Sequence, residues 1–137
     1  MDETKRAWVR SWLIKSGSDL RSARALLALT EPATDTASYH CQQAAEKALK
    51  AFLAYRDRPL ERTHDLERLL ELAVELDAEF GAFTAHAELL NPYASAYRYP
   101  GTSAILFPSV AEIAAAVEQA DALCAFVLGK LPGETWP

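Results

Sequence analysis

The stretch from residue 37 to residue 66, ASYHCQQAAEKALKAFLAYRDRPLERTHDL, decides the fold class. Its apolar residues recur at intervals of three and four: Cys41, Ala44, Ala45, Ala48 and Phe52. This spacing places them on one face of an α-helix, and their small size permits a neighbouring helix to pack closely. Pro59 ends the helix, because the residue before a proline avoids helical geometry. The stretch therefore predicts a helix that packs within a bundle.

The same helix carries a polar edge. Glu46 and Lys50 are four residues apart, so we expect them to pair on the exposed side, which stabilises a helix by only about 0.2–0.5 kcal/mol. Gln43 and Lys47 have side chains that can hydrogen-bond a base or a phosphate, although such residues more often meet water or a neighbouring helix. His64, in the sequence TH, is a further candidate for ligand or partner contacts, although a lone histidine there more often makes local hydrogen bonds at a helix start than performs catalysis.

Helical periodicity extends over most of the remaining chain. We expect a first helix from about residue 8 to residue 29, weakened at Gly17, and then a turn at EPATDT, whose short polar residues offer N-caps. A short helix follows with Thr63 as its N-cap, a fourth runs from about residue 78 toward residue 98 with a kink at Pro92, and Ser109 caps a last helix. No alternating strand pattern occurs. The prediction is an all-α, antiparallel up-and-down bundle of about five helices in a single domain over residues 1–137.

Composition narrows the function classes. The chain has 137 residues and a formal charge of −5, and no apolar run approaches the roughly 20 residues that span a membrane, so we expect a cytoplasmic protein. An acidic chain argues against a nonspecific grip on duplex DNA, which needs many lysines and arginines together. Cys41 and Cys124 are far apart in sequence, which indicates buried apolar residues rather than a disulfide framework or a zinc site.

The charge is unevenly distributed along the chain. Residues 1–68 carry 12 lysines and arginines against 10 aspartates and glutamates, whereas residues 69–137 carry 2 against 9. Such asymmetry can mark a face for an anionic ligand, but solvated helix faces explain it more simply. No glycine-rich phosphate loop, Ser-His-Asp order or metal-ligand cluster occurs, so the sequence predicts neither a cofactor nor a metal.

Three motifs occur in order: YHCQQAAEKALKAFL at 39–53, THDLERLLELA at 63–73 and LNPYASAYRYPG at 90–101. Together they resemble the HEPN domain family of small prokaryotic helical proteins, and the resemblance covers roughly residues 5 to 130. It implies a four-to-five-helix bundle, frequently a homodimer, that acts with or on a minimal nucleotidyltransferase and can bind a nucleotide. Some branches of that family are toxins that cut RNA.

One sequence motif distinguishes the ribonuclease branch of that family. That motif is an arginine followed after four to six residues by a histidine near the start of a late helix. Arg98 stands where the arginine is expected, but no histidine occurs after His86. Arg58 and His64 have a matching spacing, yet they lie across the turn at Pro59, so we interpret that match as chance. We therefore predict a noncatalytic protein with no catalytic residues, and the alternative is an RNA-cleaving toxin of a toxin–antitoxin pair.

The third motif holds the strongest candidates for ligand or partner contacts: Tyr93, Tyr97, Arg98 and Tyr99. Aromatic rings can stack on a base while a guanidinium binds phosphate oxygens, so the cluster suits a nucleotide. Tyrosine and arginine also dominate protein interfaces, so a surface that docks a nucleotidyltransferase is an equal alternative. A third interpretation is purely structural: Arg98 pairs with a carboxylate such as Glu46 and braces the bundle.

Overall fold

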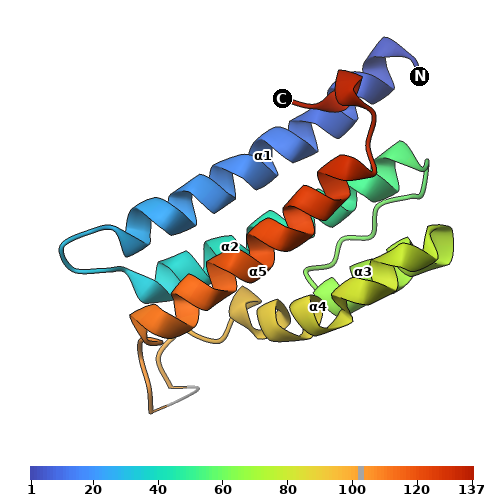
Figure 1. Ribbon diagram of the computed structural model, residues 1–137. Helices are drawn as coiled ribbons and strands as arrows, with labels where there is room; N and C mark the ends of the chain where they lie inside the picture. Colours follow the sequence, from blue (N-terminus) through green and yellow to red (C-terminus); the bar gives the residue numbers. More distant parts are fainter. Residues whose placement is uncertain (102–103) are drawn as a thin grey trace.

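The computed structural model describes residues 1–101 and 104–137 as a bundle of five α-helices with short 3-10 turns (Figure 1). The helices are α1 (Glu3–Leu27), α2 (Thr34–Tyr55), α3 (Leu66–Leu76), α4 (Thr84–Leu90) and α5 (Val110–Gly129). The 3-10 turns are η1 (Ala78–Phe83), η2 (Asn91–Ala94) and η3 (Gly133–Thr135). No strand occurs in these two described ranges, so the predicted all-α bundle is confirmed.

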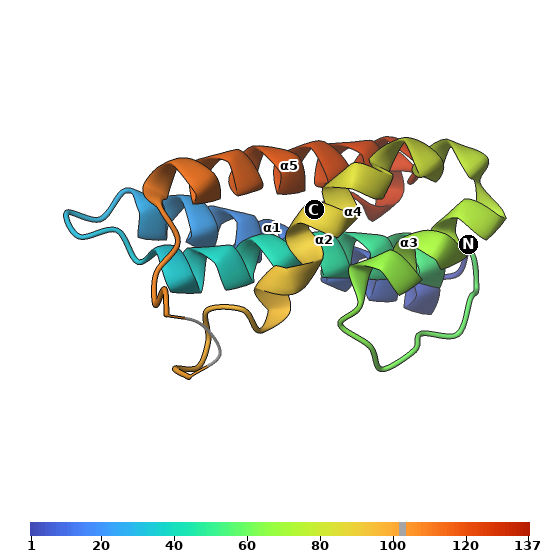
Figure 2. The same ribbon diagram turned by 90° about the horizontal axis from the view of Figure 1, so that it is seen from below.

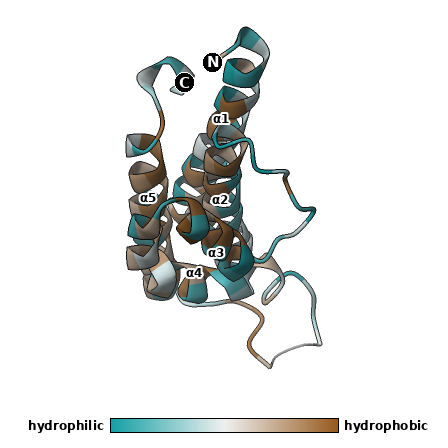
Figure 3. Ribbon diagram, turned by 90° about the vertical axis from the view of Figure 1, so that its right-hand side faces the viewer, coloured by the Kyte–Doolittle hydropathy of each residue, from teal (hydrophilic) through white to brown (hydrophobic). Residues whose placement is uncertain are grey.

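Helix α2 is the centre of the bundle. It packs against α1 along most of its length, α5 packs on both α1 and α2, and α3 with α4 covers a further side (Figures 1 and 2). The predicted stripe is confirmed, since all five of its members are buried, and Phe52 adds a ring contact of 4.4 Å between centroids with Phe80. Figure 3 shows the brown apolar residues concentrated on the helices and the connection after α2 largely teal. Neighbours on several sides explain why α2 is buried almost all round.

The connection from residue 56 to residue 65 doubles back along the bundle, so α3 runs in the same direction as α2 (Figure 2). Contacts at the shared end agree with this: Arg58 and Glu75 form an ion pair of 3.0 Å, and Arg56 donates to the carbonyl of Leu76. Helices α1 and α2 are antiparallel, as are α3 and α4 (Figure 1).

The expectation that Glu46 and Lys50 pair on the exposed side of α2 is wrong. Glu46 and Lys50 pair at 3.2 Å, but their side chains are only 4 % and 9 % exposed, so the pair lies inside the protein rather than on its surface. The reason is that the returning connection covers this edge of α2: the Glu46 carboxylate also contacts Nδ1 of His64, and Gln42 donates to the backbone carbonyl of His64. Helical spacing alone cannot show this cover.

The predicted fourth helix is also wrong. Residues 78–94 form η1, α4 and η2 in place of one long helix, and a turn follows. Pro92 lies in the first turn of η2, where its missing N–H and its ring prevent α4 from continuing. Thr63 is not the cap of α3, because Asp65 is its N-cap and Thr63 instead accepts from the backbone of Asp65. Gly17 does not interrupt α1.

Of the helix caps predicted before α2 and before α5, the first is wrong and the second is confirmed. The N-cap of α2 is Ala33 and makes no side-chain cap, so the polar residues of EPATDT do not fill this role. Ser109 caps α5 as predicted, accepting from the backbone N–H of Glu112. Among the helices of the described residues, none combines the length and the apolar character that crossing a bilayer requires.

Candidate functional site

A pocket of about 400 Å³ opens between the first turns of α2 and the turn that follows η2. We call it the Tyr39–Arg98 pocket, and its lining residues are Asp35, Thr36, Tyr39, His40, Tyr97 and Arg98. Four of them come from α2, and the other two follow η2, so residues almost 60 positions apart share one site. The lining residues belong to the end of the bundle where α2 begins and where the long connection to α5 starts (Figure 1).

The guanidinium of Arg98 lies over two aromatic rings. Its guanidinium carbon is 4.2 Å from the ring centroid of Tyr39 and 5.5 Å from that of Tyr99. No ion pair joins Arg98 to a carboxylate within residues 1–101 and 104–137, and the residue is exposed. A guanidinium stacked by its face keeps its N–H edges directed outward, where they can bind two oxygens of one anion.

His40 is held from behind by a buried carboxylate. Its Nδ1 is 2.7 Å from Oδ1 of Asp19, and Nζ of Lys47 is 2.6 Å from the other carboxylate oxygen. The Asp19 side chain is 11 % exposed, whereas that of His40 is 31 % exposed and faces the pocket. The imidazole also stacks on Tyr39, with centroids 5.9 Å apart and planes 25° apart. The orientation of this histidine is therefore fixed on two sides.

Close packing of α1 on α2 explains how so short a side chain as Asp19 reaches His40. Ser16 and Asp19 both lie on the buried face of α1, and Ser16 donates a hydrogen bond of 2.7 Å to the backbone carbonyl of Ala44. That contact requires the two helices to lie close, which the alanines of α2 permit. The Asp19–His40 bond is then one turn away along the same interface.

The structure brings some of the predicted residues together. Tyr97 and Arg98 line the pocket, and the exposed Tyr99 lies beside Arg98. Lys47 contributes indirectly, because it binds the carboxylate that positions His40. The predicted residues that share one site are therefore Lys47, Tyr97, Arg98 and Tyr99.

The other predicted residues lie elsewhere. Tyr93 is buried and donates to Glu112, and burial together with that carboxylate raises the pKa of its hydroxyl well above the usual value. Gln43 is buried and donates to Gln42. His64 is exposed outside the pocket and contacts Glu46.

The structural interpretation in which Arg98 pairs with Glu46 is wrong. The carboxylate of Glu46 is already contacted by Lys50 and by Nδ1 of His64, together with the carboxamides of two neighbouring glutamines. Arg98 stacks on Tyr39 instead, at the outer end of α2. Removing Arg98 therefore leaves the buried charges paired.

Sequence reasoning missed five residues of the site: Asp19, Asp35, Thr36, Tyr39 and His40. His40 could not be recognised from its neighbours in sequence, because its partner Asp19 lies 21 residues earlier on another helix. The neighbouring Tyr39 gave no periodic signal of its own. The sequence signal that could have identified the site is the adjacent tyrosine and histidine at the start of α2. If α1 and α2 are antiparallel neighbours, these two residues lie beside α1.

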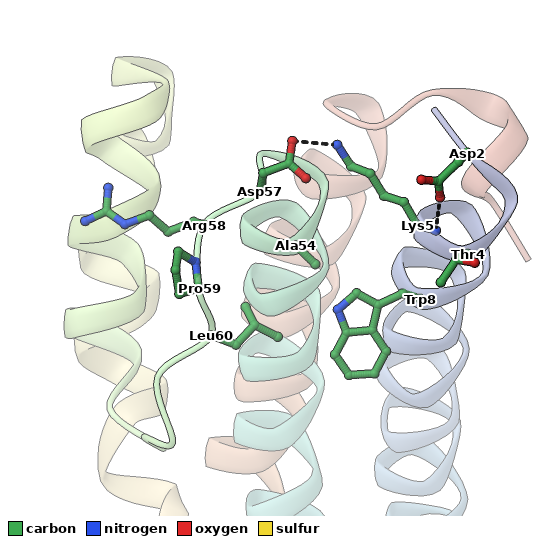
Figure 4. A pocket seen from close by; sticks show the side chains of 9 residues that line it. All are labelled: Asp2, Thr4, Lys5, Trp8, Ala54, Asp57, Arg58, Pro59 and Leu60. Atoms are coloured by element: carbon green, nitrogen blue, oxygen red, sulfur yellow. Dashed lines mark hydrogen bonds and ion pairs between the residues drawn. The ribbon is translucent and has the colours of Figure 1, made fainter.

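A second depression, of about 540 Å³, lies at the other end of the bundle (Figure 4). The indole of the half-exposed Trp8 faces Leu60 across it, below the ion pair between Lys5 and Asp57. Arg58 at its rim pairs with Glu75. Because its cations already have carboxylate partners, this depression is a poorer anion site than the Tyr39–Arg98 pocket.

The remaining reactive groups are structural. Cys41 and Cys124 are free thiols, and burial raises the pKa of Cys41 to about 12 and that of Cys124 to about 11, so both stay protonated at neutral pH. In the described part of the chain, no three histidine, cysteine or carboxylate side chains gather as a metal site would require.

Comparison with known proteins places this fold. The family model described as HEPN domain matches residues 9–131. A crystal structure of TT1696 from Thermus thermophilus is 27 % identical, with a TM-score of 0.78 over 91 % of this chain and 99 % of that chain. ST0689, an archaeal HEPN homologue, is 20 % identical, with a TM-score of 0.71 over 89 % of this chain and 96 % of that chain, and shows the same fold. No curated protein matches significantly. Because the family model covers nearly the whole bundle, the chain belongs to the HEPN domain family.

Proposed function

We propose that the chain is a noncatalytic binding domain that recognises a nucleotide in the Tyr39–Arg98 pocket and acts with a minimal nucleotidyltransferase. The observation that carries the proposal is the stack of Arg98 on Tyr39, with 4.2 Å between the guanidinium carbon and the ring centroid, in a pocket open to solvent. The stack holds a cation in place while its hydrogen-bonding edges stay available for an anion.

The pocket offers a partner for each part of a nucleotide. Arg98 can bind the phosphate, the ring of Tyr97 can stack on the base, and the carboxylate of Asp35 can accept hydrogen bonds from ribose hydroxyls. The volume of about 400 Å³ falls within the range of roughly 300–1,000 Å³ that is usual for small-molecule sites. The three chemistries together favour a nucleotide over a simple anion.

The partner part of the proposal rests on the motifs that resemble the family and on the rim of the pocket. Arg98 and Tyr99 are exposed there, and these residue types contribute strongly to protein interfaces. We also propose that the protein is cytoplasmic, since nucleotides and nucleotidyltransferases both occur in the cytoplasm. A homodimer is part of the same proposal.

Replacement of Arg98 by alanine tests the nucleotide part. Loss of a hydrogen bond to a charged group costs about 1.5–3 kcal/mol, so we expect affinity for nucleotides to fall by about 10-fold to 150-fold in calorimetry. The melting temperature should change little, because Arg98 is exposed and makes no ion pair with a carboxylate of the described residues. Arg10→Ala removes the same charge from an exposed position on α1 and serves as the matched control.

Equal nucleotide binding by the wild type and by Arg98→Ala would remove Arg98 from the site. A clear fall in melting temperature for Arg98→Ala, with nucleotide binding retained, would instead restore a bracing role for this residue. Arg98→Lys separates charge from shape, since lysine keeps the charge but not the bidentate geometry, and we expect it to bind more weakly than the wild type.

A second candidate function, RNA cleavage, is favoured by one observation. An arginine and a histidine, Arg98 and His40, line the same pocket although they do not form the family's Arg-to-His sequence motif. The noncatalytic proposal predicts that single-stranded RNA and transfer RNA stay intact with the purified protein. Metal-independent cleavage that His40→Ala abolishes would establish the second candidate in its place.

A further inference from the structure

His40 lines the Tyr39–Arg98 pocket, and only one of its two ring nitrogens has a hydrogen-bond partner among the described residues. Its Nδ1 contacts Asp19 at 2.7 Å, and no hydrogen bond to its Nε2 is present in the part of the chain that the structure describes. In a neutral imidazole with the proton on Nδ1, Nε2 can only accept a hydrogen bond. Protonation converts Nε2 into a charged donor, while Nδ1 keeps its contact with the Asp19 carboxylate.

The charges around His40 come from three parts of the fold. Asp19 from α1 and Lys47 from α2 pair at 2.6 Å and offset each other. Asp35 at the start of α2 is negative, and Arg98 after η2 is positive. These groups sum to no net charge, so the pocket becomes positive overall only when His40 takes up a proton.

We propose that protonated His40 is a second phosphate ligand beside Arg98, so that the pocket selects a phosphate monoester over a diester and takes up one proton when it binds. This inference rests on the proposed nucleotide-binding function. A terminal phosphate with a second pKa of about 6 is doubly charged at neutral pH, and two cations match it. A diester carries a single charge, which Arg98 alone can balance.

The expected pH dependence follows from the sign of the proton uptake. A neutral His40 must gain a proton before Nε2 can donate to phosphate, so in this proposal the complex holds one proton more than the free pocket. Binding of a monoester therefore weakens as the pH rises, with an upper limit of about tenfold for each pH unit when one proton is taken up. Between pH 7.0 and 8.5 the ligand's own titration contributes little, which leaves His40 as the cause.

Calorimetry with nucleoside 5′-monophosphates and their phosphate methyl esters tests this inference. The two ligands share a base and a ribose and differ in one methyl group, which removes the second phosphate charge. Titrations at pH 7.0, 7.5, 8.0 and 8.5, each in two buffers of different ionisation enthalpy, count the protons taken up. The proteins are the wild type, His40→Gln and His64→Gln, and the folded state of each is checked by circular dichroism.

His64→Gln is the matched control. His64 contacts a buried carboxylate through Nδ1 at 2.8 Å, as His40 does, but it lies outside the pocket. We expect the wild type and this control to bind the monoester about tenfold more tightly than the methyl ester at pH 7.0, with uptake near one proton. In His40→Gln, both the preference and the pH dependence should disappear, while Arg98 still supports weak binding of either ligand.

The outcomes separate this inference from the function on which it rests. If the wild type binds monophosphates equally well from pH 7.0 to 8.5, or if His40→Gln keeps the preference for the monoester, His40 is not a phosphate ligand and nucleotide binding stands alone. If no monophosphate binds to the wild type at any of these pH values, the nucleotide-binding function itself is wrong.

Discussion

Among single residues, Glu46 shows how a connection that covers one edge of α2 changes the burial and the partners of a side chain. Its carboxylate accepts from Lys50 and contacts His64, and the carboxamides of Gln42 and Gln43 are also within hydrogen-bonding distance. The ammonium of Lys50 additionally lies 5.7 Å from the ring centroid of Trp12. A buried charge of this kind is tolerated because its partners are held in place, and removing one partner leaves the other uncompensated.

We expect Glu46→Ala to lower the free energy of unfolding by about 3–5 kcal/mol, because Lys50 would remain buried without its counter-charge. The double variant Glu46→Ala/Lys50→Met removes both charges and should recover much of that loss. Urea denaturation followed by circular dichroism measures both. The exposed Glu118→Ala on α5 is the control and should stay within about 0.5 kcal/mol of the wild type. A loss below about 1 kcal/mol for Glu46→Ala would mean that Lys50 reaches solvent.

From the sequence, candidate site residues can be recognised by their type, but the neighbours that each residue has in the fold are harder to predict. Arg98 and Tyr97 were found because an aromatic and cationic cluster at a helix end is visible in one short stretch. His40 was not found, since its role depends on Asp19 from a different helix. The burial of Glu46 and Lys50 likewise depends on a connection that folds back over them, and periodicity within α2 carries no record of it.

At the scale of elements, Asn91 joins the end of α4 to the start of α3. Its side-chain oxygen accepts from the backbone N–H of Leu66 at 2.8 Å, and its nitrogen donates to the carboxylates of Asp65 and Glu67. The first N–H groups of a helix have no partner within it, so Asn91 satisfies one of them from outside. Through these hydrogen bonds Asn91 holds the end of α4 against the start of α3, a contact that the sequence did not predict.

Asn91→Ala should therefore destabilise the protein by about 1–2 kcal/mol, in the range found for loss of a helix cap. Hydrogen exchange at the backbone amide of Leu66 should accelerate, because that N–H loses its acceptor. Ser95→Ala, at an exposed position a few residues later, is the control and should leave both quantities unchanged. Unaltered protection of the Leu66 amide in Asn91→Ala would show that the cap is not formed in solution.

Four of the five helices could be predicted from periodicity, because α1, α2, α3 and α5 each repeat apolar residues over several turns. The region from residue 78 to residue 98 could not, since its apolar residues continue the helical spacing through η1, α4 and η2 while Pro92 breaks the backbone. Spacing reports which side chains share a face, and it does not report whether the backbone hydrogen bonds between them persist.

At the scale of the whole molecule, the connection that leads into α5 carries apolar side chains on the surface. Ile105, Leu106 and Phe107 are 62 %, 56 % and 60 % exposed, and Val110 at the start of α5 is 49 % exposed. Figure 3 shows this stretch in brown on the loop that projects below the bundle. Contiguous exposed apolar residues commonly mark an interaction surface. The bundle itself buries its core without covering them.

We predict that a second copy of the chain covers this surface in a twofold symmetric homodimer, because an isologous contact brings the same segment of each copy together at the axis. Light scattering at micromolar concentration should then give about twice the chain mass of 15.1 kDa. Leu106→Glu/Phe107→Glu places like charges opposite each other at that axis and should yield a monomer with an unchanged helical spectrum. Leu89→Glu alters another exposed apolar residue, on α4 and 42 % exposed, and should remain dimeric. A monomeric wild type would contradict the dimer itself, whereas a dimer that survives the double substitution but not Leu89→Glu would move the interface to α4.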